Sequence, residues 1–235
     1  MITELNRNQH RRRIPILDKT PSIEQYLIST CLFIIDEFNQ QFKHSNKEEL
    51  KKIANEEFNE ADFVFRLGLP FRHMAYFENK EKKGALPKTD IYIKEKDFRI
   101  EVKFLRNFLS KNKITTSNST PWKQIKGDFD WIVADIKQGK KHKSALIVGW
   151  FNSFDYFSQI IQLGAGDGPS PNYDQSKVDY FPFLIRNGPK AKQLEISYEV
   201  AYQGRNVLSP DIREHELQCM LIGTAKDKFN IALYY

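Results

Sequence analysis

The chain has 235 residues, 40% of them hydrophobic, and a formal net charge of +6 at pH 7. This length fits one large domain or one domain with an appended element, and the apolar content is enough for a buried core. No window approaches the roughly 18 continuous apolar residues of a membrane span, and the start MITELNRNQHRRR lacks the apolar stretch of a secretory signal. We therefore expect a cytoplasmic protein without a membrane partner, whose two cysteines, Cys31 and Cys219, stay reduced in the core.

The first third of the chain is predicted to be mostly helical. Residues 1–19 are expected to form a flexible basic arm. Thr20-Pro21-Ser22 is a helix-start signal, and apolar residues then recur at helical spacing over about 22–43. A second amphipathic helix is predicted from Ser45 to about Val64.

From about residue 73 the apolar period changes to two, which is typical of strands. HMAYFEN (73–79) is a possible first strand, and TDIYIKEKDFRIEVK opens a hairpin over 89–106. WIVADIK (131–137) and SALIVGWF (144–151) are rich in Val, Ile and Trp and are predicted to be strands, with Asp128 and Asp130 as turn or cap residues before the first of them. The end of the chain, 177–235, is predicted to be mostly strand, so we expect an α/β (α+β) fold with helices first and then a mixed sheet.

The hairpin has a register that its own alternation defines. A turn centred on Glu95-Lys96 places Asp90 opposite Glu101, with apolar residues on one face of the ribbon. The other face carries Asp90, Glu101 and Lys103. Opposed residues have Cβ atoms about 4.5–5.5 Å apart. Both acids and the lysine are therefore expected to point to the same side.

Two carboxylates at that distance repel each other unless one takes a proton or a cation lies between them. Oxygen ligands suit magnesium, so Asp90, Glu101 and the main-chain carbonyl of Val102 are candidate metal ligands. Lys103 would either orient or deprotonate an attacking water, or offset negative charge on a phosphorane. The alternative is that these side chains form the ordinary solvated face of an exposed hairpin.

Basic residues are concentrated after the acids of the hairpin. Residues 101–143 contain ten Lys or Arg against four Asp or Glu. Clustered positive charge favours an anionic partner such as nucleic acid, and the alternative is ordinary solvated surface. The residues expected to contact nucleic acid are Arg106, Lys111, Lys113, Lys123, Lys126, Lys140, Lys141 and Lys143.

Asp90 followed by Glu101-Val102-Lys103 at the end of the second hairpin strand resembles the PD-(D/E)xK, or restriction-endonuclease-like, nuclease superfamily. The predicted order of helix, strand, acid-bearing strand, E-V-K strand, helix and strand is similar to the core of that superfamily. The resemblance covers about 47–150, with Thr89 in place of the proline that often precedes the first acid. It implies a single nuclease-like domain over 20–235, with a restriction-endonuclease-like core, an N-terminal helical segment and a β-rich extension.

The resemblance also implies roles for further residues. Asp90 and Glu101 would bind the metal and Lys103 would assist the water. Members often add an acid from the preceding helix, for which Glu57 is the candidate because it is expected on the inward stripe, with Glu56 and Glu60 at more exposed angles. Gln124, on the helix after E-V-K, would support the site or bind a phosphate, and an exposed helix glutamine is the alternative.

The function that the resemblance implies is a magnesium-dependent endonuclease, with Mn2+ as a substitute ion, that hydrolyses phosphodiester bonds in DNA. A restriction or defence enzyme is one setting, homodimerisation to cut both strands is an expectation, and RNA is an alternative substrate. The alternative function is an inactive nuclease-like domain that binds nucleic acid or a protein partner without cutting.

Overall fold

The computed structural model of the chain describes residues 22–77, 89–106, 120–140, 142–166, 170–208, 212–213 and 215–235. The expected arm over 1–19 lies outside these residues. The helical segments are α1 (Ile23–Gln41), α2 (Lys47–Lys52), η1 (Ile53–Glu57), α3 (Glu60–Gly68), η2 (Leu69–Met74), η3 (Lys94–Lys96), α4 (Thr120–Lys137), α5 (Phe157–Ile160), α6 (Gln175–Val178), η4 (Ala191–Gln193) and η5 (Tyr198–Val200). The strands are β1 (Ala75–Phe77), β2 (Ile91–Ile93), β3 (Phe98–Leu105), β4 (Ser144–Phe151), β5 (Leu184–Arg186), β6 (Leu194–Ile196), β7 (Gly204–Asn206), β8 (Gln218–Ile222) and β9 (Phe229–Tyr234).

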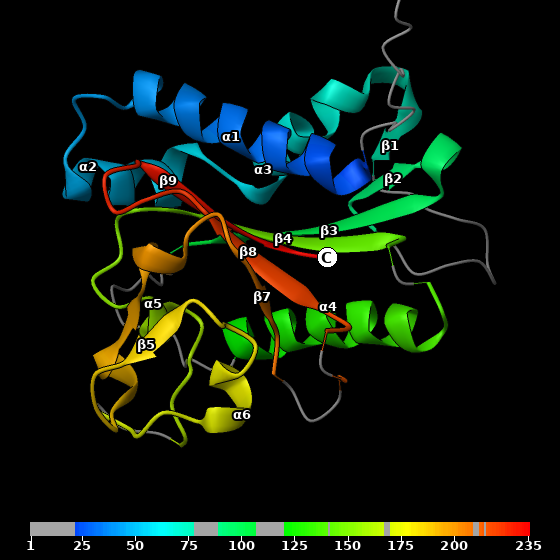
Figure 1. The fold of residues 1–235 in the computed structure, drawn as a ribbon. Coiled ribbons are helices and arrows are strands. Elements are labelled where there is room, and N and C mark those ends of the chain that lie inside the picture. Colours follow the sequence, from blue (N-terminus) through cyan, green and yellow to red (C-terminus); the bar gives the residue numbers. More distant parts are fainter. Residues whose placement is uncertain are drawn as a thin grey trace, which may run out of the picture.

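Seven strands form one mixed sheet in the order β1-β2-β3-β4-β9-β8-β7. β3 and β4 are parallel, and α4 makes the connection between them (Figure 1). The other neighbouring pairs of this sheet are antiparallel. The expected α+β class with a mixed central sheet flanked by helices is therefore confirmed.

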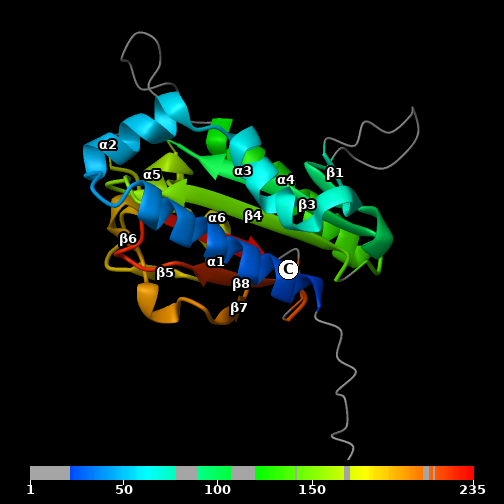
Figure 2. The ribbon, with the colours of Figure 1, turned by 90° about the horizontal axis from the view of Figure 1, so that it is seen from above.

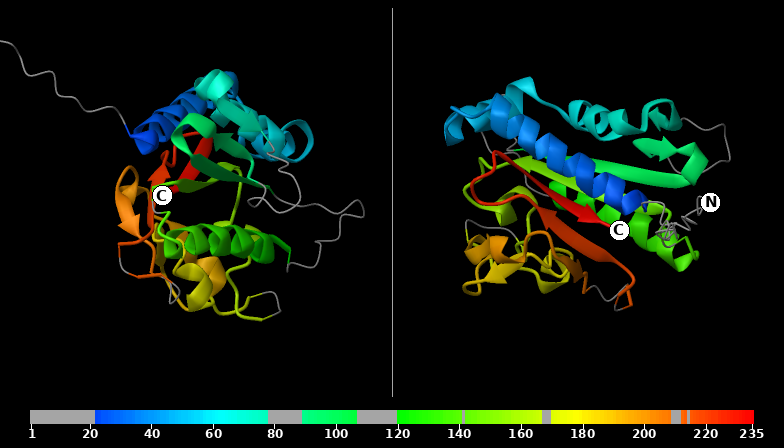
Figure 3. Two further views of the ribbon diagram at one scale, coloured as in Figure 1. Left: turned by 90° about the vertical axis from the view of Figure 1, so that its right-hand side faces the viewer. Right: turned by 45° about the horizontal axis from the view of Figure 1, so that its top comes forward.

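Helices cover both faces of the sheet. α1, α2 and α3 lie on one face, and α4 lies on the other together with α5, α6 and the small β5-β6 sheet (Figures 1 and 3). Figure 2 shows α1 and α3 side by side over the sheet. Phe38, Phe63 and Phe229 belong to the core under α1 and α3, and Phe129 and Trp150 belong to the core under α4. A polar side chain on either face of β3 is therefore enclosed, and it needs a polar partner.

The first helix begins where the sequence signal predicts. The Ser22 side chain accepts from the backbone N–H of Gln25, and the Gln25 side chain accepts from the backbone N–H of Ser22, which forms a capping box. The predicted helix over 22–43 is confirmed as α1, and Cys31 lies on its buried face as a free thiol.

The second predicted helix is interrupted twice. α2 leads into the π-helical turn η1, and the chain leaves helical geometry at Phe58 before α3 begins. Asn59 caps α3: its side chain accepts from the backbone N–H of Asp62, and the Asp62 carboxylate accepts from the backbone N–H of Asn59. The cap restarts the helix with a new rotational phase, so residues before and after Asn59 do not share one continuous stripe.

The strand predicted at WIVADIK, 131–137, is wrong. These residues are the second half of α4, and Asp128 and Asp130 are interior helix residues rather than turn or cap residues. Ile125, Phe129 and Ile132 are all buried, and their spacing of four and three residues is helical. The neighbouring β-branched residues favour a strand by local preference, but packing against the sheet decides in favour of the helix.

Of the strands predicted after residue 140, the first is confirmed, whereas the prediction that 177–235 is mostly strand is wrong: β5, β6, β7, β8 and β9 take up a minority of its described residues, and turns, 3₁₀ segments and irregular chain take up the rest. SALIVGWF, 144–151, is β4, with its whole length buried. β8 and β9 belong to the same sheet as the hairpin, so part of the end of the chain lies beside β4. Within the described ranges, no helix combines the length and the apolar character needed to cross a membrane.

Candidate active site

The predicted register of the hairpin is confirmed. Tyr92 pairs with Arg99 and Ile91 with Ile100, and the turn lies at η3. Asp90 is the residue next to β2, and Glu101 is the next residue of β3, so the two acids lie at adjoining positions across the ribbon. The expected apolar face, which includes Ile91, Ile100 and Val102, is buried.

The polar face of the hairpin is not the open, solvated surface of the alternative interpretation. α4 covers it: Arg99 forms a buried ion pair with Asp135, and only 18% of the Lys103 side chain is exposed. Glu101 is half-buried. The ionisable groups of the hairpin therefore face α4, and their contacts with one another and with the acids of α4 set their pKa values.

Two carboxylates bind the free edge of β3. The pairing of β2 with β3 stops at Ile91, the first residue of β2, which lies opposite Ile100; from Glu101 onward the described residues provide no strand on this side of β3. The backbone N–H of Val102 donates to Asp90 Oδ2 at 2.7 Å, and the backbone N–H of Phe104 donates to Glu60 Oε2 at 2.9 Å. These two acids replace the hydrogen bonds that a neighbouring strand would supply.

The Lys103 side chain contacts two carboxylates, those of Asp128 and Glu60. Its Nζ is 3.5 Å from Asp128 Oδ2 and 3.7 Å from Glu60 Oε2. Helix α3, the hairpin and helix α4 thus bring four carboxylates, from Glu60, Asp90, Glu101 and Asp128, to one lysine. If all four were ionised, the cluster would have a clear surplus of negative charge.

The helix acid that reaches the cluster is Glu60, and Glu57 does not reach it. Glu57 lies in η1 with an exposed side chain, so its expected position on the inward stripe is wrong. Glu60 is in the first turn of α3, where the Asn59 cap directs it to β3. The sequence contains the signal for this phase change, since Asn59 and Asp62 have capping-box spacing.

A strand over 131–137, as predicted from the sequence, leaves Asp128 in a turn, whereas the observed helix brings Asp128 into the cluster. As helix residues, Asp128 and Asp135 are seven positions apart and therefore lie on one face of α4. They meet Lys103 and Arg99, which share a face of β3. The two ion pairs form a ladder between strand and helix.

The environment of the cluster shifts three pKa values. Burial, and then the charges of Asp90 and Asp128, raises the pKa of Glu101 to about 8. Burial raises the pKa of Asp128 to about 6, against the opposing effect of Lys103. Burial by itself would lower the pKa of Lys103, but the surrounding carboxylates outweigh it and the pKa is raised. Lys103 therefore stays charged at neutral pH, while Glu101 of the metal-free protein holds a proton that a bound cation would displace.

These shifts predict that the Glu101→Gln variant is more stable than the wild type at pH 8 and nearly equal to it at pH 4.5. The pKa of Glu101 rises from 4.5 to about 8 on folding, so between these values the folded protein holds a proton that the unfolded chain releases. Its free energy of unfolding therefore falls as the pH rises, and glutamine removes this dependence. The raised pKa of Asp128 also lowers the free energy of unfolding as the pH rises, up to about pH 6.

The measurement is urea unfolding at pH 4.5, 6 and 8. Glu95→Gln, an exposed substitution in the turn of the same hairpin, is the matched control. It should shift the unfolding free energy equally at the three pH values. A Glu101→Gln variant that loses stability at pH 8 would contradict the assigned environment.

The donor set fits a hard divalent cation. Asp90 and Glu101 supply carboxylate oxygens, and the carbonyl of Val102 lies on the same edge of β3 as its N–H, which faces Asp90. The surplus of carboxylates over Lys103 also favours a cation. Among the described residues, no group of three or more His, Cys, Asp or Glu side chains is arranged to hold a metal ion. The candidate ligands are two side chains, Asp90 and Glu101, and the main-chain carbonyl of Val102, while Glu60 and Asp128 contact Lys103.

The other predicted residues are spread around this cluster. Gln124 and Lys123 are exposed on the first half of α4, and Gln124 lies one turn before Asp128 on the same face. Arg106, at the end of the described hairpin, is half-buried.

The remaining basic residues are either in ion pairs or outside the described chain. Lys126 pairs with Asp130, Lys140 Nζ is 4.0 Å from Asp135 Oδ1, and Lys143 Nζ is 3.2 Å from Asp97 Oδ2. These lysines offset local acids as well as adding positive charge. The residues that lie outside the described ranges are Lys111, Lys113 and Lys141.

Comparison of the chain with protein-family models, with curated proteins and with solved structures gave no match.

Proposed function

We propose that this protein is a magnesium-dependent endonuclease of the PD-(D/E)xK type that hydrolyses phosphodiester bonds in DNA. The observation that carries the proposal is the convergence of Asp90, Glu101 and Lys103 on one side of the hairpin, at the free edge of β3. The element order α3, β1, β2, β3, α4, β4 supports the same assignment, as does the parallel pairing of β3 with β4.

The side chains of the cluster have separable roles. A magnesium ion held by Asp90, Glu101 and the Val102 carbonyl would activate the attacking water and offset charge on the phosphate. Glu60 and Asp128 hold the Lys103 ammonium group beside these ligands. Because its pKa is raised, Lys103 keeps its proton, which favours offsetting charge on the phosphorane over removing a proton from water.

Substrate binding would use positive charge next to the cluster. Lys123 is exposed on α4, one and a half turns before Asp128, and Arg106 follows β3. Contacts of this kind to phosphates raise affinity in a salt-dependent way. A homodimer would allow both strands of a duplex to be cut.

The test is incubation of the purified protein with plasmid DNA in magnesium, in manganese and in excess chelator. We expect nicked or linear products with either metal and intact plasmid with chelator. Labelled RNA in the same assay identifies an RNA substrate. Binding of either nucleic acid without cleavage in any metal would overturn the enzyme proposal and support the inactive binding module.

A matched pair of variants tests which helix carboxylate belongs to the site. Glu60→Gln is expected to lower the cleavage rate by about 10- to 100-fold, since residues that orient metal ligands and their partners typically contribute this much. The glutamine still accepts from the Phe104 N–H, so the fold is retained. Glu57→Gln, only three residues earlier and exposed, should cleave at the wild-type rate. The reverse order of effects would restore Glu57 as the site residue.

A further inference from the structure

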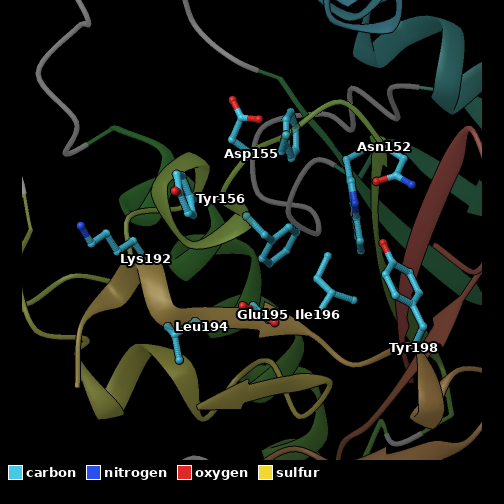
Figure 4. A pocket seen from close by; sticks show the side chains of 11 residues that line it. Asn152, Asp155, Tyr156, Lys192, Leu194, Glu195, Ile196 and Tyr198 are labelled. Atoms are coloured by element: carbon cyan, nitrogen blue, oxygen red, sulfur yellow. The ribbon is translucent and has the colours of Figure 1, made fainter. Parts of the chain in front are cut away.

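A hollow of about 250 Å³ lies beyond the carboxyl end of β4, where α5 and β6 meet it (Figure 4). None of the four clustered carboxylates lines it. In open sheets with parallel strands, ligands bind preferentially outside the carboxyl ends of the strands. The hollow is therefore a second candidate site, next to the cluster on β3.

The floor of the hollow is aromatic and rigid. Trp150 is 2% exposed, and its ring lies 4.9 Å from that of Phe157, centroid to centroid. The Trp150 ring also stacks on the ring of Phe183, with centroids 6.1 Å apart and an angle of 20° between the ring planes. Leu194 is buried beside these rings. These rings pack against one another and are nearly closed to solvent, so they form a rigid apolar support for the rest of the lining, in which Tyr156 has the most exposed ring.

The walls of the hollow include two tyrosine rings. Tyr156 and Tyr198 lie on opposite sides of the hollow, with Ile196 between them (Figure 4). Tyr156 is 45% exposed, so its ring is accessible to a ligand.

The rim combines one cation, Lys192, with hydrogen-bond acceptors. Lys192 and Glu195 are both exposed there, and Asp155 is held by Lys47, whose Nζ is 2.8 Å from Asp155 Oδ1. A nucleotide presents the matching groups: a planar base, amino groups that donate to carboxylates, and a phosphate that binds a lysine.

The hollow is close to the carboxylate cluster along the sheet. Lys103 pairs with Val148, and Trp150 lies two residues further along β4, a rise of about 7 Å in a parallel strand. The side chains of Val148 and Trp150 lie in the core under α4, the face on which Lys103 meets Asp128. Trp150, at the inner end of the hollow, therefore lies on the same face of the sheet as Lys103 and close to it along the strands, which places the hollow beside a nucleotide that flanks a phosphate at Lys103.

We infer that the hollow binds an unpaired or extruded base of the nucleic acid strand whose scissile phosphate lies at the carboxylate cluster. This inference rests on the proposed nuclease function and adds to it a site that reads one base. Stacking on aromatic side chains supplies the affinity, as in other proteins that hold a base outside the helical stack. Asp155 and Glu195 supply acceptors that distinguish bases bearing amino groups from those without.

The test uses a fluorescein-labelled oligodeoxynucleotide containing 2-aminopurine, with calcium in place of magnesium. Binding is followed by fluorescence anisotropy, and stacking by quenching of 2-aminopurine. Tyr156→Ala should raise Kd about tenfold and remove the quenching, because it deletes one stacking surface. Tyr156→Phe keeps the ring and should restore both. Tyr26→Ala is the matched control, since Tyr26 is 46% exposed on α1, across the sheet.

The outcomes separate this inference from the proposed function. If the wild type cuts DNA but Tyr156→Ala binds and quenches like the wild type, the base site is overturned and the nuclease stands. Equal losses in Tyr156→Ala and Tyr26→Ala would also overturn it. If no metal supports cleavage but Tyr156 still governs binding and quenching, the base site stands and the nuclease is overturned.

Discussion

Replacing Lys103 with alanine is expected to lower the rate of DNA cleavage at saturating DNA by about 10²- to 10³-fold. Lys103 is the cation that Glu60 and Asp128 hold beside Asp90 and Glu101. Its ammonium group is mostly shielded from water, and a fixed charge in a shielded site stabilises a developing negative charge more strongly than one in solvent. The measurement is a single-turnover rate with plasmid DNA at saturating magnesium.

Lys123→Ala is the control for this effect. Lys123 is exposed on α4 and belongs to the predicted nucleic acid contacts. Loss of one phosphate contact should weaken DNA binding and lower its salt dependence by about one ion, with the rate at saturating DNA unchanged. Far-UV circular dichroism establishes that both variants are folded. A Lys103→Ala variant that retains more than a tenth of the wild-type rate would contradict the assigned role.

Replacing Asp135 with alanine is expected to destabilise the protein by about 3–5 kcal/mol. Asp135 and Arg99 form an ion pair in which the two side chains are 6% and 5% exposed. The Arg99 guanidinium also lies 5.6 Å from the centroid of the Trp131 ring. Without Asp135 the buried arginine charge has lost its hydrogen-bonded partner, while Lys140, three residues after the end of α4, adds a like charge nearby. For a chain of this size the loss corresponds to a fall in Tm of roughly 6–20 °C.

The same helix provides the matched control. Asp130→Ala removes an exposed carboxylate that pairs with Lys126 one turn away, and this should cost only about 0.5 kcal/mol. Both variants change aspartate to alanine within α4, so the gain in helix propensity is shared. Guanidinium unfolding measures the difference. Equal stabilities of the two variants would show that the Arg99–Asp135 pair does not fix α4 on the sheet.

The ladder of ion pairs connects these two predictions. Arg99 and Lys103 on β3 meet Asp135 and Asp128 on α4, so the pair at one end sets the position of the acid at the other. A small rate effect is therefore expected even in those Asp135 variants that remain folded.

Local alternation in the sequence determined the hairpin. Its register, its turn and the common direction of Asp90, Glu101 and Lys103 follow from a period of two, because a slip by one residue would exchange the two faces of the ribbon. The start of α1 at Ser22 and the strand β4 were likewise readable, since a capping box and a continuous apolar run depend only on neighbouring residues.

Only the tertiary structure decided which other residues join the cluster. Glu60 and Asp128 contact Lys103 because the Asn59 cap resets the phase of α3 and because the residues predicted as a strand form α4. The hollow at Trp150 depends on α5 and β6 meeting the end of β4. Contacts between segments distant in the chain depend on helix phase and packing, whereas the pattern of a hairpin is fixed by residues that are close in sequence.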